Sequence, residues 1–272
     1  MTDDMPNSDY PTLLHYDLGN GVTAFSSTRK GGVSQGNYAE FNINHYCGDD
    51  EQAIAANCFA LCHLLGIDSN HLAYPHQVHG TEVRQIGVNW PSLSEQERAQ
   101  MLEGVDAVMT DTAGVCIGVS TADCIPILLY DAEHHACAAI HAGWRGTVAR
   151  IAEKAVEAMT LSYHTDASQL KAVIGPGISL ESFEVGDEVY ESFSAAGFDM
   201  ERIAHRYAKW HIDLWEANRL SLIKMGVGAD AIQISGICTY THADRFFSAR
   251  RLGINSGRIF TGIILNVLDE VR

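Results

Sequence analysis

The sequence predicts one α/β domain built around a buried β-sheet, and three observations carry this prediction. The chain has 272 residues, 46% of them hydrophobic, and no segment rich in proline, glycine or serine divides it. Four short runs in its middle are apolar on both faces, which is typical of strands in a covered sheet. Segments with apolar residues at helical spacing precede and follow these runs. We therefore expect residues 1–272 to form a single domain.

The N-terminal part predicts a leader, a strand and a helix. Residues 1–18 are polar and acidic, and we expect them to form a loosely ordered leader. Residues 22–27 predict a strand that runs into a glycine-rich turn, with Arg29 beside that turn. Residues 51–65 carry apolar side chains at helical spacing, and Gly66 follows where a C-cap glycine would end the helix.

The middle of the chain holds the most regular pattern. Residues 72–86 predict strand, turn and strand around a histidine segment, and residues 92–103 predict a charged amphipathic helix or an insertion. Residues 146–160 predict an amphipathic helix, so Arg145 lies at a strand-to-helix junction, where free backbone N–H groups commonly hold ligands. The four apolar runs, each predicted to be a strand, are residues 105–109, 115–119, 125–130 and 136–140.

The C-terminal part continues with strands and helices, and no internal repeat is visible. A turn at Gly175 and Pro176 allows close backbone approach. The expected elements are a strand at 170–174, helices near 187–195 and 214–225, and strands at 231–234 and 258–264.

Charge and composition narrow the classes of function. The chain has 18 Lys and Arg against 34 Asp and Glu, a formal net charge of −16, so its surface should repel nucleic acid and acidic membranes. An anionic substrate would then need individually placed arginines. The N-terminus is acidic where a secretory signal would be basic, and no stretch reaches the roughly 18 apolar residues of a membrane span, so we expect a cytoplasmic protein. The seven cysteines have no framework spacing and are expected to be reduced.

One cysteine and two histidines are the candidates for chemistry. Cys124 begins a predicted strand and His141 ends a later strand of the same block, so the two ends can converge on one side of a sheet. His79, on a turn-like segment upstream, can supply a third ligand. One thiolate and two imidazoles with an open fourth position would make a catalytic zinc site. Alternatively, Cys124 as nucleophile and His141 as base would make a cysteine hydrolase, and spacing alone does not separate the two.

Each of these residues also has a purely structural interpretation. A cysteine in an apolar strand is often a small buried hydrophobe, and single histidines are often hydrogen-bonded core residues. Arginines beside glycines or aromatic residues form the second candidate set, because guanidinium groups bind phosphate or carboxylate with two parallel hydrogen bonds. Surface ion pairs are the alternative for each of them. These arginines are Arg29, Arg145, Arg250 and Arg251.

Short strings spread in order over nearly the whole chain resemble the laccase-domain family. This family is also called the YfiH-like multicopper polyphenol oxidoreductases or the bacterial peptidoglycan editing factors. The matching strings are STR at 27–29, GGVS at 31–34, CGD at 47–49, QVHG at 77–80, TADC at 121–124, HAGWRG at 141–146, GP at 175–176, FEVG at 183–186 and CT at 238–239.

The resemblance implies a fold and a metal site. The fold is a layered α/β sandwich with mixed β-sheets flanked by helices, similar to toxin-type cysteine deamidases. The implied metal ligands are His79, Cys124 and His141, and the implied metal is zinc despite the copper in the family name. In folds of this kind a Cys–His pair also serves as nucleophile and base, so the two interpretations of Cys124 and His141 both stay open.

The resemblance also implies activities and a small-molecule substrate. Family members are described as purine nucleoside phosphorylases acting on adenosine, inosine and methylthioadenosine, with adenosine deaminase activity, and alternatively as editors of peptidoglycan precursors. They were earlier described as copper polyphenol oxidases. A laccase holds several coppers with HxH-type clusters, and this chain has no HxH sequence, which argues against multicopper oxidation.

For phosphorolysis, the family-matching segments supply the residues that we expect to bind substrate. Arg29 and Arg145 are predicted to hold the phosphate, with Arg250 as a further anion binder. Asn42, in a segment similar to an Asn-Leu-Gly string of the family, is predicted to contact the sugar. His79, Cys124 and His141 are the predicted catalytic residues.

Overall fold

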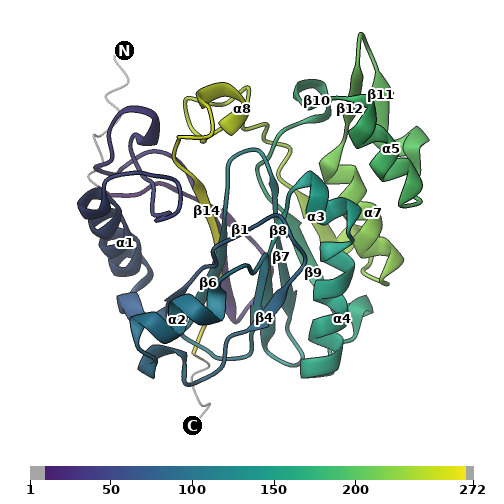
Figure 1. Ribbon diagram of the computed structural model, residues 1–272. Coiled ribbons are helices and arrows are strands. Elements are labelled where there is room, and N and C mark those ends of the chain that lie inside the picture. The colour runs from purple at the N-terminus through teal and green to yellow at the C-terminus, as the bar shows by residue number, and fades with distance from the viewer. Residues whose placement is uncertain (1–9, 268–272) are drawn as a thin grey trace, which may run out of the picture.

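Two large β-sheets pack face to face, and helices cover both outer faces (Figure 1). The structure is a computed structural model that describes residues 10–267. Both large sheets mix parallel and antiparallel strands, so the layered α/β sandwich expected from the resemblance is confirmed. Within the described residues, no helix has the length and apolar character needed to cross a membrane.

The first sheet lies on the side of the N-terminal helix. Its strands are antiparallel except for the short last strand, which runs parallel to its neighbour. In spatial order they are β1 (Leu13–Tyr16), β2 (Val22–Ser27), β14 (Ile259–Leu265), β6 (Cys116–Thr121) and β3 (Leu72–Ala73).

The second sheet carries most of the predicted apolar runs. Its central strands are antiparallel, and each edge strand runs parallel to its neighbour. In spatial order they are β13 (Ile232–Ile234), β9 (Lys171–Ile174), β7 (Ile125–Asp131), β8 (Ala136–Ala142), β5 (Ala107–Thr110) and β4 (Val83–Gln85). A small antiparallel sheet stands apart from both, in the order β10 (Glu184–Val185), β12 (Trp210–Ile212) and β11 (Ala204–Arg206).

Side-chain alternation along the strands builds three layers of core. On β8, Ala138 and Ile140 face the helices, whereas Cys137 and Ala139 face the first sheet. The outer face of the first sheet packs Phe25 and other residues against helix α1. Because both faces of the second sheet are covered, its strands are apolar throughout, as the sequence pattern predicted.

The helices differ in how clearly the sequence encodes them. Helix α1 (Glu51–Leu65) begins at Asp50, whose side chain accepts from Ala53 N, and ends at Gly66 in the left-handed conformation, as predicted. Helix α2 (Glu95–Leu102) has a capping box formed by Ser94 and Glu97. The others are α3 (Trp144–Val148), α4 (Ile151–Tyr163), α5 (Asp187–Ala195), α6 (Met200–Ile203), α7 (Leu214–Lys224) and α8 (Ala249–Leu252).

Three expectations differ from the structure. Part of the expected leader, Leu13–Tyr16, forms β1 because it pairs with β2, while residues 1–9 lie outside the described part. The helix predicted at 146–160 is divided into α3 and α4 by Arg150, whose φ is 66° and whose guanidinium donates to Ala196 O. The four central runs all form strands, but β6 belongs to the first sheet and the other three to the second.

The close approach of Phe260 to Gly118 generates a stability prediction. A Cβ at Gly118 on β6 would lie 2.2 Å from Phe260 Cζ, so Gly118→Ala should force the ring or strand β14 to move and destabilise the protein by about 1–3 kcal/mol. Urea unfolding measures this loss. Gly228→Ala is the matched control, because its Cβ would meet only Ala231 Cβ at 3.9 Å. Equal stability of the two variants would contradict the packing described for β6 and β14.

Candidate metal centre

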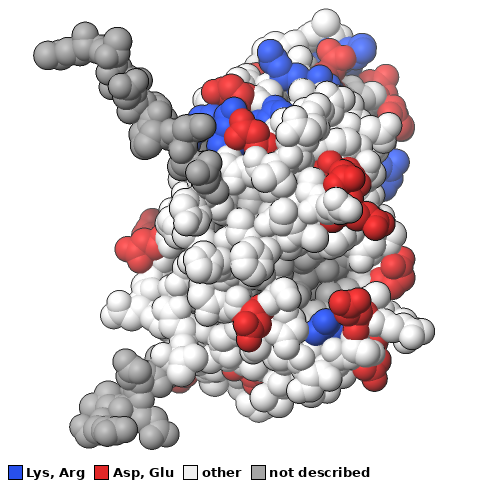
Figure 2. Space-filling view, turned by 90° about the vertical axis from the view of Figure 1, so that its left-hand side faces the viewer, with Lys and Arg blue, Asp and Glu red and all other residues white. Residues whose placement is uncertain are grey.

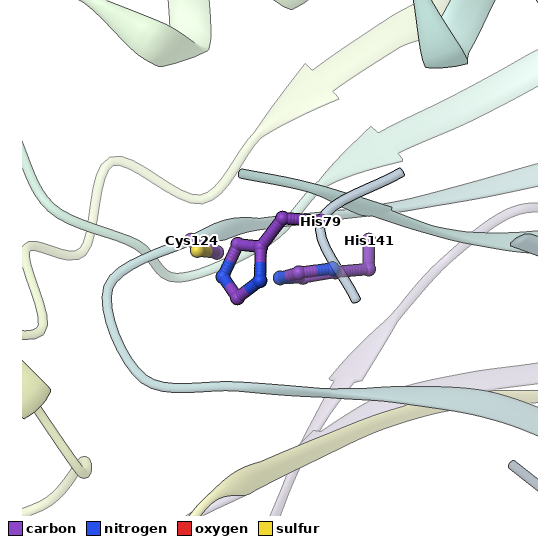
Figure 3. A group of neighbouring side chains, drawn as sticks. All are labelled: His79, Cys124 and His141. Atoms are coloured by element: carbon purple, nitrogen blue, oxygen red, sulfur yellow. The ribbon is translucent and has the colours of Figure 1, made fainter. Parts of the chain in front are cut away.

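Three side chains from separate parts of the chain point toward one another at one end of the two sheets (Figure 3). They are His79, Cys124 and His141, which we call the triad. Their ligand atoms, two imidazole nitrogens and one sulfur, all lie within 4.8 Å of one another. Within residues 10–267 this is the one group of three or more His, Cys, Asp or Glu side chains placed to hold a metal ion.

The hairpin of β7 and β8 brings Cys124 and His141 together. Cys124 directly precedes β7, and the antiparallel register pairs Ile125 with Ala142 and Pro126 with His141. The start of one strand therefore meets the end of the other, which realises the predicted convergence. His141 lies two residues beyond Ala139 on the face that looks toward the first sheet, so its ring enters the space between the sheets.

Asp106, which directly precedes β5, positions both histidines of the triad. Its carboxylate is fully buried and accepts from His141 Nδ1 at 2.7 Å, and its backbone oxygen accepts from His141 N at 2.8 Å. The same carboxylate accepts three successive backbone N–H groups, from Val78 at 3.2 Å, His79 at 2.9 Å and Gly80 at 2.7 Å. One side chain thus holds both a ligand ring and the loop that carries the other histidine.

The charge state of Asp106 follows from these bonds. Burial alone would raise its pKa, but the hydrogen bond and charge of His141, together with the N–H groups of Gly80 and Val78, outweigh burial and leave the pKa below its usual range. Asp106 is therefore an anion that keeps the proton of His141 on Nδ1. The lone pair of His141 is then on Nε2, the atom available to a metal.

The thiol of Cys124 is activated by the same neighbours. Burial opposes its ionisation, but His141 and then His79 more than compensate, and the pKa of Cys124 falls well below its ordinary value. Burial would likewise lower the pKa of His141, but Cys124 and Asp106 raise it. Deprotonated sulfur is the form that binds a metal, and it is also the form that attacks an electrophile.

The backbone is in an unusual conformation at His79 and at Asp123, which precedes Cys124. His79 has φ 62° and Asp123 has φ 89°, both in a region that residues other than glycine rarely adopt. The carboxylate of Asp123 accepts from Thr239 Oγ1 at 2.7 Å and from Arg250 N at 2.7 Å. These bonds hold Asp123 in place, and strain of this kind is typical of positions that must aim a functional side chain.

The donor set and its surroundings fit a zinc ion. Zinc binds sulfur at about 2.3 Å and imidazole nitrogen at about 2.0–2.1 Å, so donor atoms grouped this closely need only small rotations to meet one ion. Gly143 leaves the necessary room, since a Cβ there would lie 2.8 Å from His79 Cδ2 and 3.0 Å from Cys124 Sγ. The carboxylate behind His141 is the usual partner of a metal-binding histidine.

The triad lines a cavity of about 190 Å³, which we call the triad pocket. Two hydroxyl groups on its wall, of Ser120 and Thr121, are buried and have no hydrogen-bond partner within the described part of the chain. Gln77 supports this wall, because its side chain donates to Ser120 O and accepts from Ser120 N, both at 2.7 Å. Unpartnered buried hydroxyl groups are uncommon in folded proteins, and these two lie in residues that line the pocket.

The predicted sugar and phosphate contacts Asn42 and Arg29 lie outside the triad pocket. The guanidinium of Arg29 donates to Ala39 O at 2.7 Å and Ala243 O at 2.6 Å, so it joins two loops of the protein. Asn42 is fully buried, donates to Asp49 Oδ2 at 2.9 Å and accepts from Arg258 N at 3.0 Å. The hydrogen bonds of both side chains are thus made to other groups of the protein.

Arg145 and Arg250 do not line the triad pocket either, although Ala249, which precedes Arg250, does. The exposed guanidinium of Arg145 lies 4.3 Å from the centre of the Trp144 ring. Arg250 donates from Nη1 to Glu184 O at 3.2 Å, and Arg251 donates to Tyr240 O. The structure therefore unites the three predicted metal ligands but brings none of the predicted substrate-binding residues to their pocket.

Arg258 is the basic residue that sequence reasoning missed. It lines the triad pocket, and its guanidinium donates to Gly257 O at 3.0 Å and Ile254 O at 2.9 Å, while no bond within the described residues engages Nε. Asp106 was missed as well. Its position just inside an apolar run was the only signal, and without the pairing of β5 with β8 nothing linked it to His141.

Comparison with known proteins agrees with this picture. Residues 23–266 match the family model described as multi-copper polyphenol oxidoreductase laccase. A purine nucleoside phosphorylase of Bacteroides thetaiotaomicron is 46% identical over 98% of both chains. A protein from an unknown prokaryotic organism, named adenosine deaminase RL5, is 44% identical over 89% of this chain and 94% of its own length.

Solved structures share the fold. The hypothetical protein YfiH of Bacillus licheniformis superposes with a TM-score of 0.86 at 26% identity, over 95% of this chain and 98% of that one. YlmD of Geobacillus stearothermophilus gives 0.84 at 29% identity, over 93% and 94%. The fold, the triad and these matches together show that the chain belongs to the multi-copper polyphenol oxidoreductase laccase family, the family of YfiH and YlmD.

Proposed function

We propose that this protein is a zinc enzyme that cleaves purine nucleosides with phosphate and also deaminates adenosine. The observation that carries the proposal is the triad, a cysteine and two histidines that line one pocket, with both histidines positioned by one buried carboxylate. Relatives of 46% and 44% identity bear the names purine nucleoside phosphorylase and adenosine deaminase, which supports both activities. Adenosine, inosine and methylthioadenosine are the substrates that we propose.

In this proposal His79, Cys124 and His141 hold the zinc ion. When bound, zinc supplies a Lewis acid that polarises an oxygen of water or phosphate. The sulfur ligand lowers the net charge of the site, and Asp106 keeps Nε2 of His141 aimed at the metal. Copper also binds thiolate and imidazole, but multicopper oxidation needs several metal sites, and residues 10–267 contain one such group.

The wall of the triad pocket supplies the remaining contacts. Arg258 is an arginine that lines the triad pocket, whereas Arg29 and Arg145 do not. We propose that Arg258 attracts the phosphate in their place. The unpartnered hydroxyl groups of Ser120 and Thr121 can donate to phosphate or ribose oxygens. With the anion and the sugar held together, the glycosidic bond lies next to its attacking group.

A second candidate function uses the same residues without metal. The lowered pKa of Cys124 and the raised pKa of His141 describe a thiolate beside an imidazolium, the arrangement of a cysteine hydrolase. Such an enzyme would edit peptidoglycan precursors. We place either reaction in the cytoplasm, because all seven cysteines are free and reduced thiols persist there.

Product analysis tests the first proposal. Zinc-loaded protein should convert adenosine and phosphate to adenine and ribose 1-phosphate, and adenosine and water to inosine and ammonia, as followed by chromatography. Omitting phosphate should abolish adenine release and leave deamination, because only phosphorolysis consumes the anion. Failure to form any of these products at full zinc occupancy would exclude the proposed function.

A substitution at Cys124 separates the metal ligand from the nucleophile. Cys124→Ser should lose both zinc and turnover, because a hydroxyl group is a poor zinc ligand beside two imidazoles. Metal analysis and nucleoside assays check this. Cys238→Ser is the control, because Cys238 is a buried free cysteine that bonds to Ser179 and Ser182 instead of to the triad. Tight zinc binding with lost turnover in Cys124→Ser would favour the hydrolase.

Asp106→Asn tests the carboxylate behind the ligands. The amide cannot stabilise the charge of His141 and offers one acceptor for four N–H groups, so zinc affinity should fall by about 10- to 100-fold. Competition with a zinc chelator measures the affinity, and thermal unfolding verifies that the variant is folded. The exposed Asp111→Asn, at the other end of β5, should bind zinc like the parent protein. Unchanged affinity in a folded Asp106→Asn protein would refute the positioning role.

A further inference from the structure

A second and larger cavity adjoins the triad pocket. It measures about 400 Å³ and lies between α2 and the segment that ends in β3, and we call it the aromatic pocket. Figure 2 views this side of the molecule, where side chains are mostly uncharged and a hollow lies among them. The residues that matter for its chemistry are His45, Tyr46, Tyr74, Trp90, Glu95 and Arg98.

Tyr46 borders both cavities. Its ring stacks on His76 of the triad pocket with a centroid distance of 4.1 Å and an interplanar angle of 19°. Glu103 fixes His76, because its carboxylate contacts His76 Nδ1 at 2.9 Å. Although it is a large aromatic residue, Tyr46 remains 48% exposed at this junction. A ligand that leaves the triad on this side therefore meets the face or edge of Tyr46.

The sizes of the cavities indicate that the triad pocket alone does not hold a whole nucleoside. Ligand pockets usually measure about 300–1,000 Å³, so the triad pocket at 190 Å³ is too small for a whole nucleoside. It has room for the sugar and an anion. The aromatic pocket, at about 400 Å³, lies within the usual range of ligand pockets and has room for a bicyclic base.

The wall of the aromatic pocket suits a flat heteroaromatic ring. The rings of His45 and Tyr74 are parallel within 3°, and the Trp90 ring forms a buried wall. On α2, the carboxylate of Glu95 and the guanidinium of Arg98 form no hydrogen bond or ion pair within residues 10–267, although Arg98 lies 5.9 Å from the Trp90 ring centre. An acceptor and a donor are thus available to the amino group and ring nitrogens of a purine.

We infer that the nucleoside spans both cavities, with its ribose at the triad and its purine base beyond Tyr46 in the aromatic pocket. This assignment of the base site rests on the proposed function for the identity of the substrate. It makes Tyr46 and α2 determinants of base specificity, and it gives the segment 89–103 a role in binding. Substitutions in Tyr46 or α2 should therefore weaken binding of the base and leave the reacting groups at the triad unchanged.

Blocking the aromatic pocket tests the inference. Ala99 is exposed and lines this pocket, so Ala99→Trp should fill it without disturbing the core. Gln100→Trp is the control, because it places the same side chain at the next exposed position of α2, and Gln100 lines neither pocket. Calorimetry with zinc-loaded protein should show adenine binding that Ala99→Trp weakens by about tenfold or more and Gln100→Trp preserves.

Steady-state kinetics then assign the bound base to the substrate. Ala99→Trp should raise KM for adenosine by about tenfold with little change in kcat or in KM for phosphate, and Tyr46→Ala should act in the same direction. Adenine that fails to bind, or that binds Ala99→Trp as well as the parent, would overturn the inference. An unchanged KM for adenosine would also overturn it, by assigning the pocket to a separate effector. Absent turnover with intact, Ala99-dependent adenine binding would refute the proposed function and keep the base site.

Discussion

The buried carboxylate of Asp106 holds a histidine ring and three successive backbone N–H groups at the same time. A buried anion costs several kcal/mol unless hydrogen bonds compensate for the lost water, and here four N–H groups provide that compensation. The positions of the two triad histidines depend on this one group. His141 receives its tautomer and orientation from it, and His79 receives the position of its loop.

The packing of the two sheets explains how the Asp106 carboxylate can be buried and still lie beside the triad pocket. The face of the second sheet that looks toward the first is apolar through Val108 and Ala139, and Asp106 and His141 continue that face by one step at the end of the β5–β8 ladder. Their polar side chains are thus desolvated by the core on one side and open to the triad pocket on the other. The low polarity of the core strengthens the Asp106–His141 hydrogen bond, and the pocket gives a ligand access to the same histidine.

Local signals in the sequence were sufficient for individual elements but not for their pairing. The bounds of α1 follow from Asp50, the apolar spacing and Gly66, all within one segment. The triad was within reach of the sequence because each ligand sits in a short motif that resembles the family. Asp106 has no such local signal, since its importance depends on the register that pairs β5 with β8. Arg29 is the opposite example. Its place beside a glycine-rich turn predicted phosphate binding, but its guanidinium bonds to Ala39 and Ala243, and sequence spacing does not reveal that these loops lie beside it.

If the triad is a metal centre, each chain binds one metal ion through one sulfur and two imidazoles. Zinc-edge X-ray absorption on the purified protein, combined with metal analysis, measures this coordination. We expect one zinc per chain, with one sulfur at about 2.3 Å and two nitrogens at about 2.0–2.1 Å from the metal. A coordination shell without sulfur, a shell with two or more sulfurs, or several coppers per chain would show that the triad does not bind metal in this way.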